Sequence, residues 1–141
     1  MRALRWGTMM AVLQGLTTMV LTADDVEAAA AWYADVLGAE PYFRRPEEGT
    51  AQYVEFRLGP DEDEFGIMDR QFSPGAGGQG TSVTYWHVAD IEATLASLLE
   101  RGSTVHAPVM ERGEGFFTAS IVDPFGNVLG LMQSPHWAAR H

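Results

Sequence analysis

The sequence contains no cysteine, which excludes disulfide bonds, thiolate catalysis and cysteine metal ligands. It also contains no lysine, because all nine basic residues are arginine, so Schiff-base chemistry is excluded. No apolar run reaches the roughly 18 residues that a membrane-spanning helix needs. The formal net charge of −10 at pH 7 disfavours nucleic acid and anionic membranes as partners. A small neutral or cationic ligand would meet no such electrostatic penalty.

A length of 141 residues with 46% apolar and 20% charged residues is typical of one globular domain with its own core. The first residues faintly resemble a signal peptide, but Thr8 and Gln14 interrupt the apolar run and no small-residue cleavage site follows. We therefore expect residues 1–15 to be an N-terminal extension of a cytoplasmic protein.

The first half of the chain predicts the element order β-α-β-β-β. Residues 16–23 are rich in β-branched side chains and predict a strand. Asp24 and Asp25 then begin a helix, with Glu27 completing a capping-box pattern from Asp24, and Gly38 ends that helix. Three extended segments follow, over residues 41–45, 51–58 and 64–70.

The second half predicts the same order after a Gly-rich joint at 73–79. Residues 81–88 predict a strand, Asp90 caps a helix that Gly102 ends, and three more strands follow over 103–109, 115–122 and 127–132. Equivalent aspartates and glycines recur 64 or 65 positions apart, as do Phe-Gly-Ile-Met at 65–68 and Leu-Gly-Leu-Met at 129–132. We therefore expect one domain over 16–134 built from two repeats, 16–72 and 80–134, with a tail at 135–141.

The repeated unit resembles a known group of proteins. Asp-Val-Glu, Trp-Tyr and Val-Leu-Gly in the first copy, with Asp-Pro-Phe-Gly-Asn at 123–127 in the second, are similar to the vicinal oxygen chelate superfamily. This superfamily contains glyoxalases, bleomycin-resistance proteins and extradiol dioxygenases. The resemblance implies an α+β fold in which two tandem β-α-β-β-β units form a curved mixed-sheet cup, usually within a homodimer.

Metal-dependent members of this superfamily hold one divalent ion through His and Glu side chains of the first and last strands of each unit. The resemblance places these ligands at Thr18, Gly66, Val83 and Gly130. Divalent ions need imidazole or carboxylate donors, and these four residues offer only one hydroxyl. We therefore expect no metal and no other cofactor, and no metal-dependent lyase or dioxygenase activity.

Strand alternation from these positions predicts which side chains line the cup. The predicted ligand-contacting residues are Thr18, Phe56, Met68, Val83, Tyr85, His87, Phe117, Thr118, Ser120 and Met132. Phe117 is included because Phe116 and Phe117 follow a Gly-Glu-Gly loop, where one of them would serve as a lid. The same alternation sends Glu55 and Arg57 toward the helix, which their polarity disfavours.

Three functions follow from an intact fold signature without metal ligands. The first is metal-independent binding of a small apolar or aromatic molecule, for which a cationic ligand would suit the acidic chain. The second is a metal-free isomerase, cyclase or lyase with His87 as general base, since His87 is the one predicted cup residue that titrates near neutral pH. The third is a structural dimerisation module whose cup is filled by side chains. His106, at a strand start, is expected at the rim.

Overall fold

A computed structural model describes residues 5–6, 9–10, 16, 18–72 and 83–141. The chain divides into two compact units. The first unit contains the described residues up to Leu21 together with Asp25–Asp69, and the second contains Thr22–Asp24 and Arg70–His141. The predicted Gly-rich joint at 73–79 lies outside the described residues. No helix in the described part of the chain is long and apolar enough to cross a membrane.

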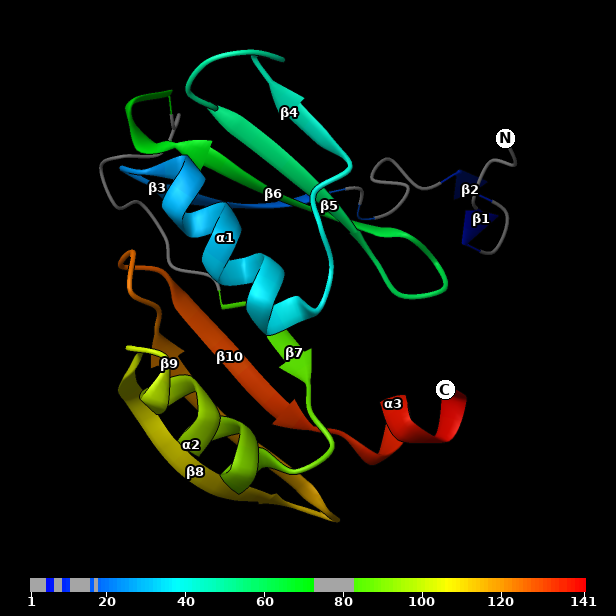
Figure 1. Cartoon of the computed structure of the whole chain (residues 1–141). Coiled ribbons are helices and arrows are strands. Elements are labelled where there is room, and N and C mark those ends of the chain that lie inside the picture. The colour runs from blue at the N-terminus through cyan, green and yellow to red at the C-terminus, as the bar shows by residue number, and fades with distance from the viewer. Residues whose placement is uncertain (1–4, 7–8, 11–15, 17, 73–82) are drawn as a thin grey trace. The chain divides into compact units, whose positions relative to one another are not determined.

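The first unit is a four-stranded sheet with one long helix (Figure 1). The sheet order is β3-β6-β5-β4, and both β4 and β6 run antiparallel to β5. Its elements are β3 (Thr18–Ala23), α1 (Val26–Leu37), β4 (Phe43–Arg45), β5 (Tyr53–Leu58) and β6 (Asp63–Asp69), followed by a 3₁₀ turn, η1 (Arg70–Phe72). Ahead of them, β1 (Arg5–Trp6) pairs with β2 (Met9–Met10).

The second unit repeats this arrangement in the order β7-β10-β9-β8 (Figure 1). Strand β7 is parallel to β10, whereas the β10–β9 and β9–β8 pairs are antiparallel. Its elements are β7 (Tyr85–His87), α2 (Ile91–Glu100), β8 (Thr104–Gly113), β9 (Phe116–Val122), β10 (Val128–Gln133) and α3 (Pro135–Arg140). The predicted α+β class and tandem β-α-β-β-β order are confirmed, and the tail adds a short helix that the sequence did not predict.

Equivalent aspartates begin the two long helices. Oδ1 of Asp25 accepts a hydrogen bond from the N–H of Ala28 at 3.0 Å, and Oδ1 of Asp90 accepts one from Ala93 at 3.1 Å. Each carboxylate satisfies a backbone donor that the first helical turn leaves open. Both N-caps match the repeat offset seen in the sequence.

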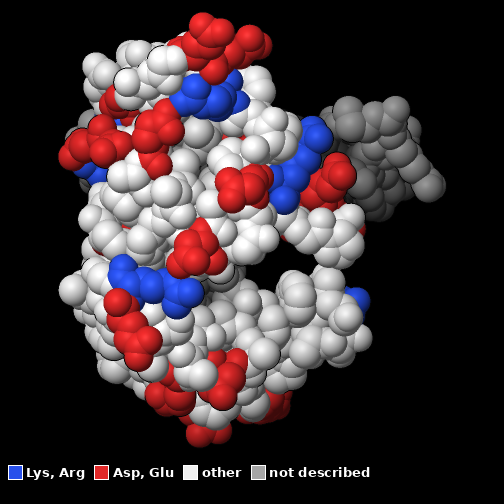
Figure 2. Space-filling view, viewed as in Figure 1, with Lys and Arg blue, Asp and Glu red and all other residues white. Residues whose placement is uncertain are grey.

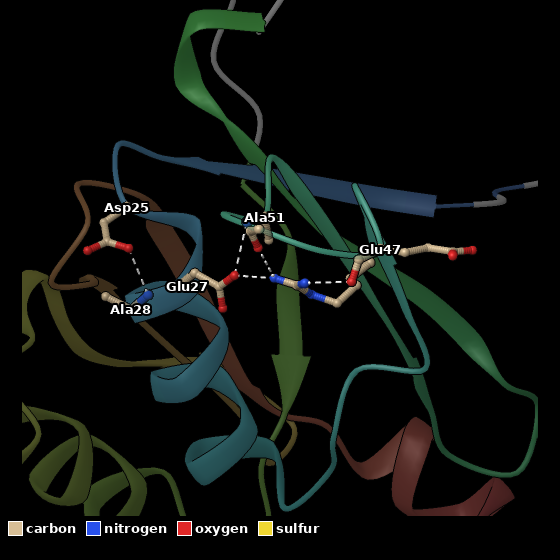
Figure 3. A network of polar contacts seen from close by, with 7 residues as sticks. Asp25, Glu27, Ala28, Glu47 and Ala51 are labelled. Atoms are coloured by element: carbon tan, nitrogen blue, oxygen red, sulfur yellow. Dashed lines mark hydrogen bonds and ion pairs between the residues drawn. The ribbon is translucent and has the colours of Figure 1, made fainter.

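The predicted capping box from Asp24 to Glu27 is wrong, because Glu27 points away from the helix start (Figure 3). Its Oε1 accepts the backbone N–H of Ala51 at 2.9 Å and pairs with the guanidinium of Arg44. Arg44 in turn donates to the carbonyl oxygens of Glu47 and Gly49. Glu27 therefore ties α1 to the connection between β4 and β5.

Each sheet buries one face against its own helix. In the first unit Tyr33 of α1 packs on Phe65 with ring centroids 5.1 Å apart, and Phe65 packs on Phe56 at 5.7 Å. Phe56, Phe65 and Ile67 are at most 1% exposed. In the second unit Ile91 and Leu98 of α2 are buried, as are four sheet residues of the same layer, Ala119, Ile121, Leu129 and Leu131. Residues that alternate with these lie on the opposite face of each sheet, which we call the helix-free face.

Candidate functional site

On the helix-free face of the first sheet, a tyrosine ring covers a glycine. Glu55 of β5 lies opposite Gly66 of β6, and Tyr53 lies opposite Met68. A β-carbon added at Gly66 would come within 2.4 Å of the Tyr53 hydroxyl oxygen and 2.8 Å of its ring. The absence of a side chain at Gly66 therefore lets the phenol lie across the strand.

Two glutamates and two tyrosines meet beside this glycine. The Tyr42 hydroxyl bonds Oε2 of Glu55 and lies 3.1 Å from Oε2 of Glu64. The Tyr53 hydroxyl bonds the other carboxylate oxygen of Glu55. We call these four residues, Tyr42, Tyr53, Glu55 and Glu64, the tyrosine–glutamate cluster.

Two further side chains flank the tyrosine–glutamate cluster. The Thr18 hydroxyl lies 3.4 Å from Oε1 of Glu64, so Thr18 faces the cluster from β3. The guanidinium of Arg57 lies 4.1 Å from the centroid of the Tyr42 ring and 3.9 Å from Oε2 of Glu64. The cluster thus already holds one cation against an aromatic face, which is the geometry of a cation–π contact.

Electrostatics at the cluster favour protonated groups. Burial raises the pKa of Glu55 above its usual value, and the charge and hydrogen bond of Glu64 raise it further, while Arg57 partly opposes the rise. Burial and then the charge of Glu64 also raise the pKa of the Tyr53 hydroxyl. Two carboxylates in one cluster disfavour the state in which both are ionised, and an incoming cation would relieve that repulsion.

The second sheet has the same tyrosine-over-glycine arrangement with different neighbours. Gly130 of β10 lies between Tyr85 of β7 and Ser120 of β9. A β-carbon at Gly130 would come within 2.5 Å of the Tyr85 ring. Ser120 Oγ lies 2.8 Å from Nδ1 of His106. Two residues before Ser120 on β9, Oγ1 of Thr118 accepts a hydrogen bond from Nε of Arg112 at 2.9 Å.

His87 is engaged by the C-terminal segment. Its Nδ1 accepts the backbone N–H of Ser134 at 3.3 Å, and its ring stacks on Trp137 with centroids 4.3 Å apart. Trp137 stacks in turn on His141 at 3.8 Å. A neutral imidazole that accepts at Nδ1 carries its proton on Nε2. This arrangement therefore leaves His87 no free basic nitrogen and does not favour its role as general base.

The structure places most of the predicted cup residues on the helix-free faces. Alternation with the buried layers, together with the contacts above, assigns Thr18, Met68, Tyr85, His87, Thr118, Ser120 and Met132 to these faces. Val83 precedes β7 and is 37% exposed. Contact of these residues with a ligand remains a prediction.

Two of the predicted cup residues lie on the wrong side. Phe56 is fully buried against Phe65 on the α1 side, so the predicted alternation in β5 is off by one residue. Phe117 lies opposite Gln133, whose side chain bonds the N–H of Ile91 at the start of α2, so both face that helix. The proposed lid position does not hold for Phe117. Phe116, on the other face, contacts the ring of His136.

Sequence reasoning missed the residues with the richest polar contacts. Glu55 was signalled by the polarity conflict that the wrong alternation created at Glu55 and Arg57, whereas Tyr53 and Glu64 had no such signal. His106 and Arg112 had no such signal, because they stand at irregularities in the pairing of β8 with β9. On the face shown in Figure 2, acidic side chains lie over both units rather than in one region, so their distribution there does not single out these residues either.

The metal ion implied by the fold does not fit these residues. Gly66 and Gly130 lie beneath tyrosine rings, Val83 has no donor, and Thr18 has only a hydroxyl that contacts Glu64. Within the part of the chain that the structure describes, no three His, Asp or Glu side chains come together in a way that would hold a metal ion.

Comparison with known proteins supports the fold. TioX from Micromonospora sp. ML1 matches with a TM-score of 0.65 and 18% identity, over 84% of this chain and 98% of that one. A lactoylglutathione lyase from Agrobacterium tumefaciens matches at 0.65 and 22%, over 90% and 98%. A glyoxalase-related enzyme from Fulvimarina pelagi matches at 0.66 and 19%, over 87% and 90%. No curated protein sequence matches the chain.

The sequence itself matches a family model over residues 15–131. That model describes the Glyoxalase/Bleomycin resistance protein/Dioxygenase superfamily, and the match covers both repeats. The chain belongs to the Glyoxalase/Bleomycin resistance protein/Dioxygenase superfamily.

Proposed function

We propose that this protein binds a small cationic aromatic molecule at the tyrosine–glutamate cluster of the first unit, without a metal ion. The observation that carries the proposal is the convergence of Glu55 and Glu64 on the Tyr42 hydroxyl, beside the exposed rings of Tyr42 and Phe43. Carboxylates supply charge for an ammonium group, and aromatic rings supply a face for both the cation and an aromatic body.

Three further features support a cationic ligand. Arg57 already rests on the Tyr42 ring, so the cluster accepts a planar cation at this position. The raised pKa of Glu55 reflects a cost of ionisation that a bound cation would lower. The protein's net charge of −10 would also attract cations from a distance at low ionic strength.

Metal independence is part of the same proposal. The positions at which metalloenzymes of the superfamily carry their ligands hold Thr18, Gly66, Val83 and Gly130, and two of them are covered by tyrosine rings. Binding would therefore depend on the carboxylates and rings alone. Cytoplasmic location and assembly as a homodimer remain expectations that accompany the proposal.

Isothermal titration calorimetry with phenethylamine and its neutral counterpart, 2-phenylethanol, tests the proposal. We expect the ammonium form to bind at least tenfold more tightly than the alcohol, and EDTA to leave both affinities unchanged. The double variant Glu55→Gln/Glu64→Gln should weaken ammonium binding about tenfold or more, equivalent to about 1.4 kcal/mol. The control Glu92→Gln/Glu100→Gln removes the same charge from exposed sites on α2 and should leave it unchanged. Equal binding of amine and alcohol, or a need for added Ni²⁺, would overturn the proposal.

A further inference from the structure

Three irregularities interrupt the pairing of β8 with β9, and two of them redirect basic side chains. The register shifts between Val105 and Ala107, between Ala107 and Met110, and between Glu111 and Gly113. The first shift leaves His106 between two pairs, and the third leaves Arg112. A bulge places an extra residue in one strand and turns its side chain out of the regular alternation. The first and third bulges in β8 therefore aim a basic group at β9.

Each redirected side chain is held by a buried hydroxyl of β9. His106 lies 2.8 Å from Ser120 Oγ through its Nδ1, and Arg112 donates from Nε to Thr118 Oγ1 at 2.9 Å. Ser120 is 5% exposed and Thr118 is 8% exposed, whereas His106 and Arg112 are themselves exposed. The hydroxyls fix one nitrogen of each basic group and leave the rest of each group facing solvent.

The two anchored groups are close enough to share one small ligand. Ser120 and Thr118 are two residues apart on β9, which corresponds to about 7 Å along a strand. Arg112 keeps its two terminal nitrogens, and within the described residues no carboxylate lies within ion-pair distance of them. A guanidinium with both terminal nitrogens available is suited to bidentate contact with a carboxylate or phosphate.

The two acidic residues that flank Arg112 in the sequence are directed elsewhere. Glu111 lies opposite Phe117 and shares its side of the sheet, which faces α2. Glu114 lies in the turn that joins β8 to β9, where it has a positive φ of 53°. Arg112 therefore combines an anchored Nε with terminal nitrogens that have no ion-pair partner in the described part of the chain.

An aromatic surface adjoins the basic pair. Ser120 lies directly opposite Gly130, and the Tyr85 ring lies across Gly130. Tyr85 is 46% exposed, so one side of its ring is available to a ligand. Met132, opposite both Thr118 and His87, extends the apolar surface along β10. The basic groups therefore border an apolar surface to which the Tyr85 ring and Met132 contribute.

We propose that His106 and Arg112 bind the oxyanion group of a small aromatic acid whose ring lies against Tyr85, on the helix-free face of the second unit. This site uses only residues of the second unit and does not depend on the tyrosine–glutamate cluster. The shared chemistry is an oxyanion, which a carboxylate or a phosphate ester can supply.

Titration of the ¹⁵N-labelled protein with benzoate, followed by NMR, tests the assignment. We expect the largest shifts at the amides of Ser120, Gly130 and Arg112, and binding at least tenfold weaker for benzyl alcohol and benzylamine. Acetate tests the contribution of the ring, and phenyl phosphate tests the alternative oxyanion. Benzoate binding should weaken as ionic strength rises.

Variants separate the oxyanion and ring contributions. Arg112→Gln keeps a polar side chain of similar length and should weaken benzoate binding tenfold or more, whereas Arg101→Gln, an exposed arginine at the end of α2, should not. Tyr85→Leu should weaken benzoate binding more than acetate binding. Failure of benzoate and phenyl phosphate to shift these amides at 20 mM would overturn the site, as would equal benzoate affinity of wild type and R112Q. Equal affinity for acetate and benzoate would overturn the aromatic part of the assignment.

Discussion

The helix-free face of the first unit gathers two carboxylates and two phenols beside one guanidinium, whereas the same face of the second unit anchors an imidazole and a guanidinium on two hydroxyls. Both sheets have the same strand order, and both place a tyrosine ring across a glycine of the last strand. The shared topology therefore gives the two units equivalent helix-free faces. A few side chains on each face decide its charge.

The two units reach their polar arrangements by different local geometry. In the first unit β5 and β6 pair without a register shift, so Glu55 and Glu64 reach the helix-free face by ordinary alternation. In the second unit β8 shifts register against β9, and His106 and Arg112 reach that face through the irregularities. Equivalent strands in a duplicated fold can thus present different residues without any change in topology.

The largest expected difference between the units is the loss of stability when an aspartate is removed from the turn between the last two strands. Asp123 is 4% exposed, and its Oδ1 accepts the backbone N–H groups of Phe125 at 2.9 Å and Asn127 at 2.8 Å. Asp123→Ala leaves these donors without that acceptor and should lower the free energy of unfolding by about 2–4 kcal/mol. In the corresponding turn of the first unit, Asp61 is exposed, and Asp61→Ala should change it by about 0.5 kcal/mol or less.

Urea denaturation of the two alanine variants measures this difference. Asp123→Asn keeps one side-chain oxygen and should recover part of the loss. Similar values for Asp123→Ala and Asp61→Ala would show that the turn carboxylate is not the source of the difference.

A second comparison concerns the covered glycines. Gly130→Ala places a methyl group within 2.5 Å of the Tyr85 ring, so the ring must move, and we expect a destabilisation of about 1–2 kcal/mol. In a Tyr85→Ala background the same change should cost nothing, because the space is then open. The double-mutant cycle Gly130→Ala/Tyr85→Ala therefore gives a coupling of about 1 kcal/mol or more, and Gly66→Ala/Tyr53→Ala provides the matching cycle. Additive effects in either cycle would contradict close contact between ring and glycine in that unit.

The repeated fold could be predicted from the sequence because its signals are local and occur twice. Asp90 caps its helix as expected, and the first helix begins at the predicted aspartate pair, although Asp25 rather than Asp24 accepts the capping bond. Gly66 and Gly130 fall at equivalent strand positions. The helix at Pro135–Arg140 was not predicted. It is six residues long, and Trp137 stacks on His87 of a distant strand, a contact that no local pattern reveals.

The candidate sites were predictable only in part. Alternation was correct for Thr118, Ser120 and Met132 because β9 and β10 pair regularly. It failed at Phe56 by one position, which exchanged Phe56 with Glu55 between the two faces. It could not place His106 or Arg112, because a bulge depends on the partner strand and leaves no mark in a single strand's pattern.

The smallest expected effect is a dependence of stability on pH that belongs to the first unit. Burial and the neighbouring Glu64 raise the pKa of Glu55 above its ordinary value, so the folded state binds more protons than the unfolded state between the unfolded and folded pKa. Stability contributed by this group is therefore present below the unfolded pKa and falls as pH rises through the folded pKa. Denaturation of wild type and Glu55→Gln between pH 4 and 7 should show this extra slope only in the wild type.

Glu64→Gln should shift the midpoint of the Glu55 carboxyl resonance to lower pH, because it removes the negative charge that, after burial, raises this pKa most. Glu92→Gln, exposed on α2, serves as the control and should shift nothing. An unchanged midpoint in the Glu64→Gln variant would show that the charge of Glu64 does not raise the pKa of Glu55. It would also contradict the expectation that both carboxylates act on one cation.

The tyrosine rings over Gly66 and Gly130 also limit which sequences can replace this one. A carboxylate introduced at either glycine would carry a β-carbon into the ring above it. Introducing a metal ligand at either position without displacing the ring would therefore need a second change, at the tyrosine. The same packing couples the glycine and the tyrosine in both repeats.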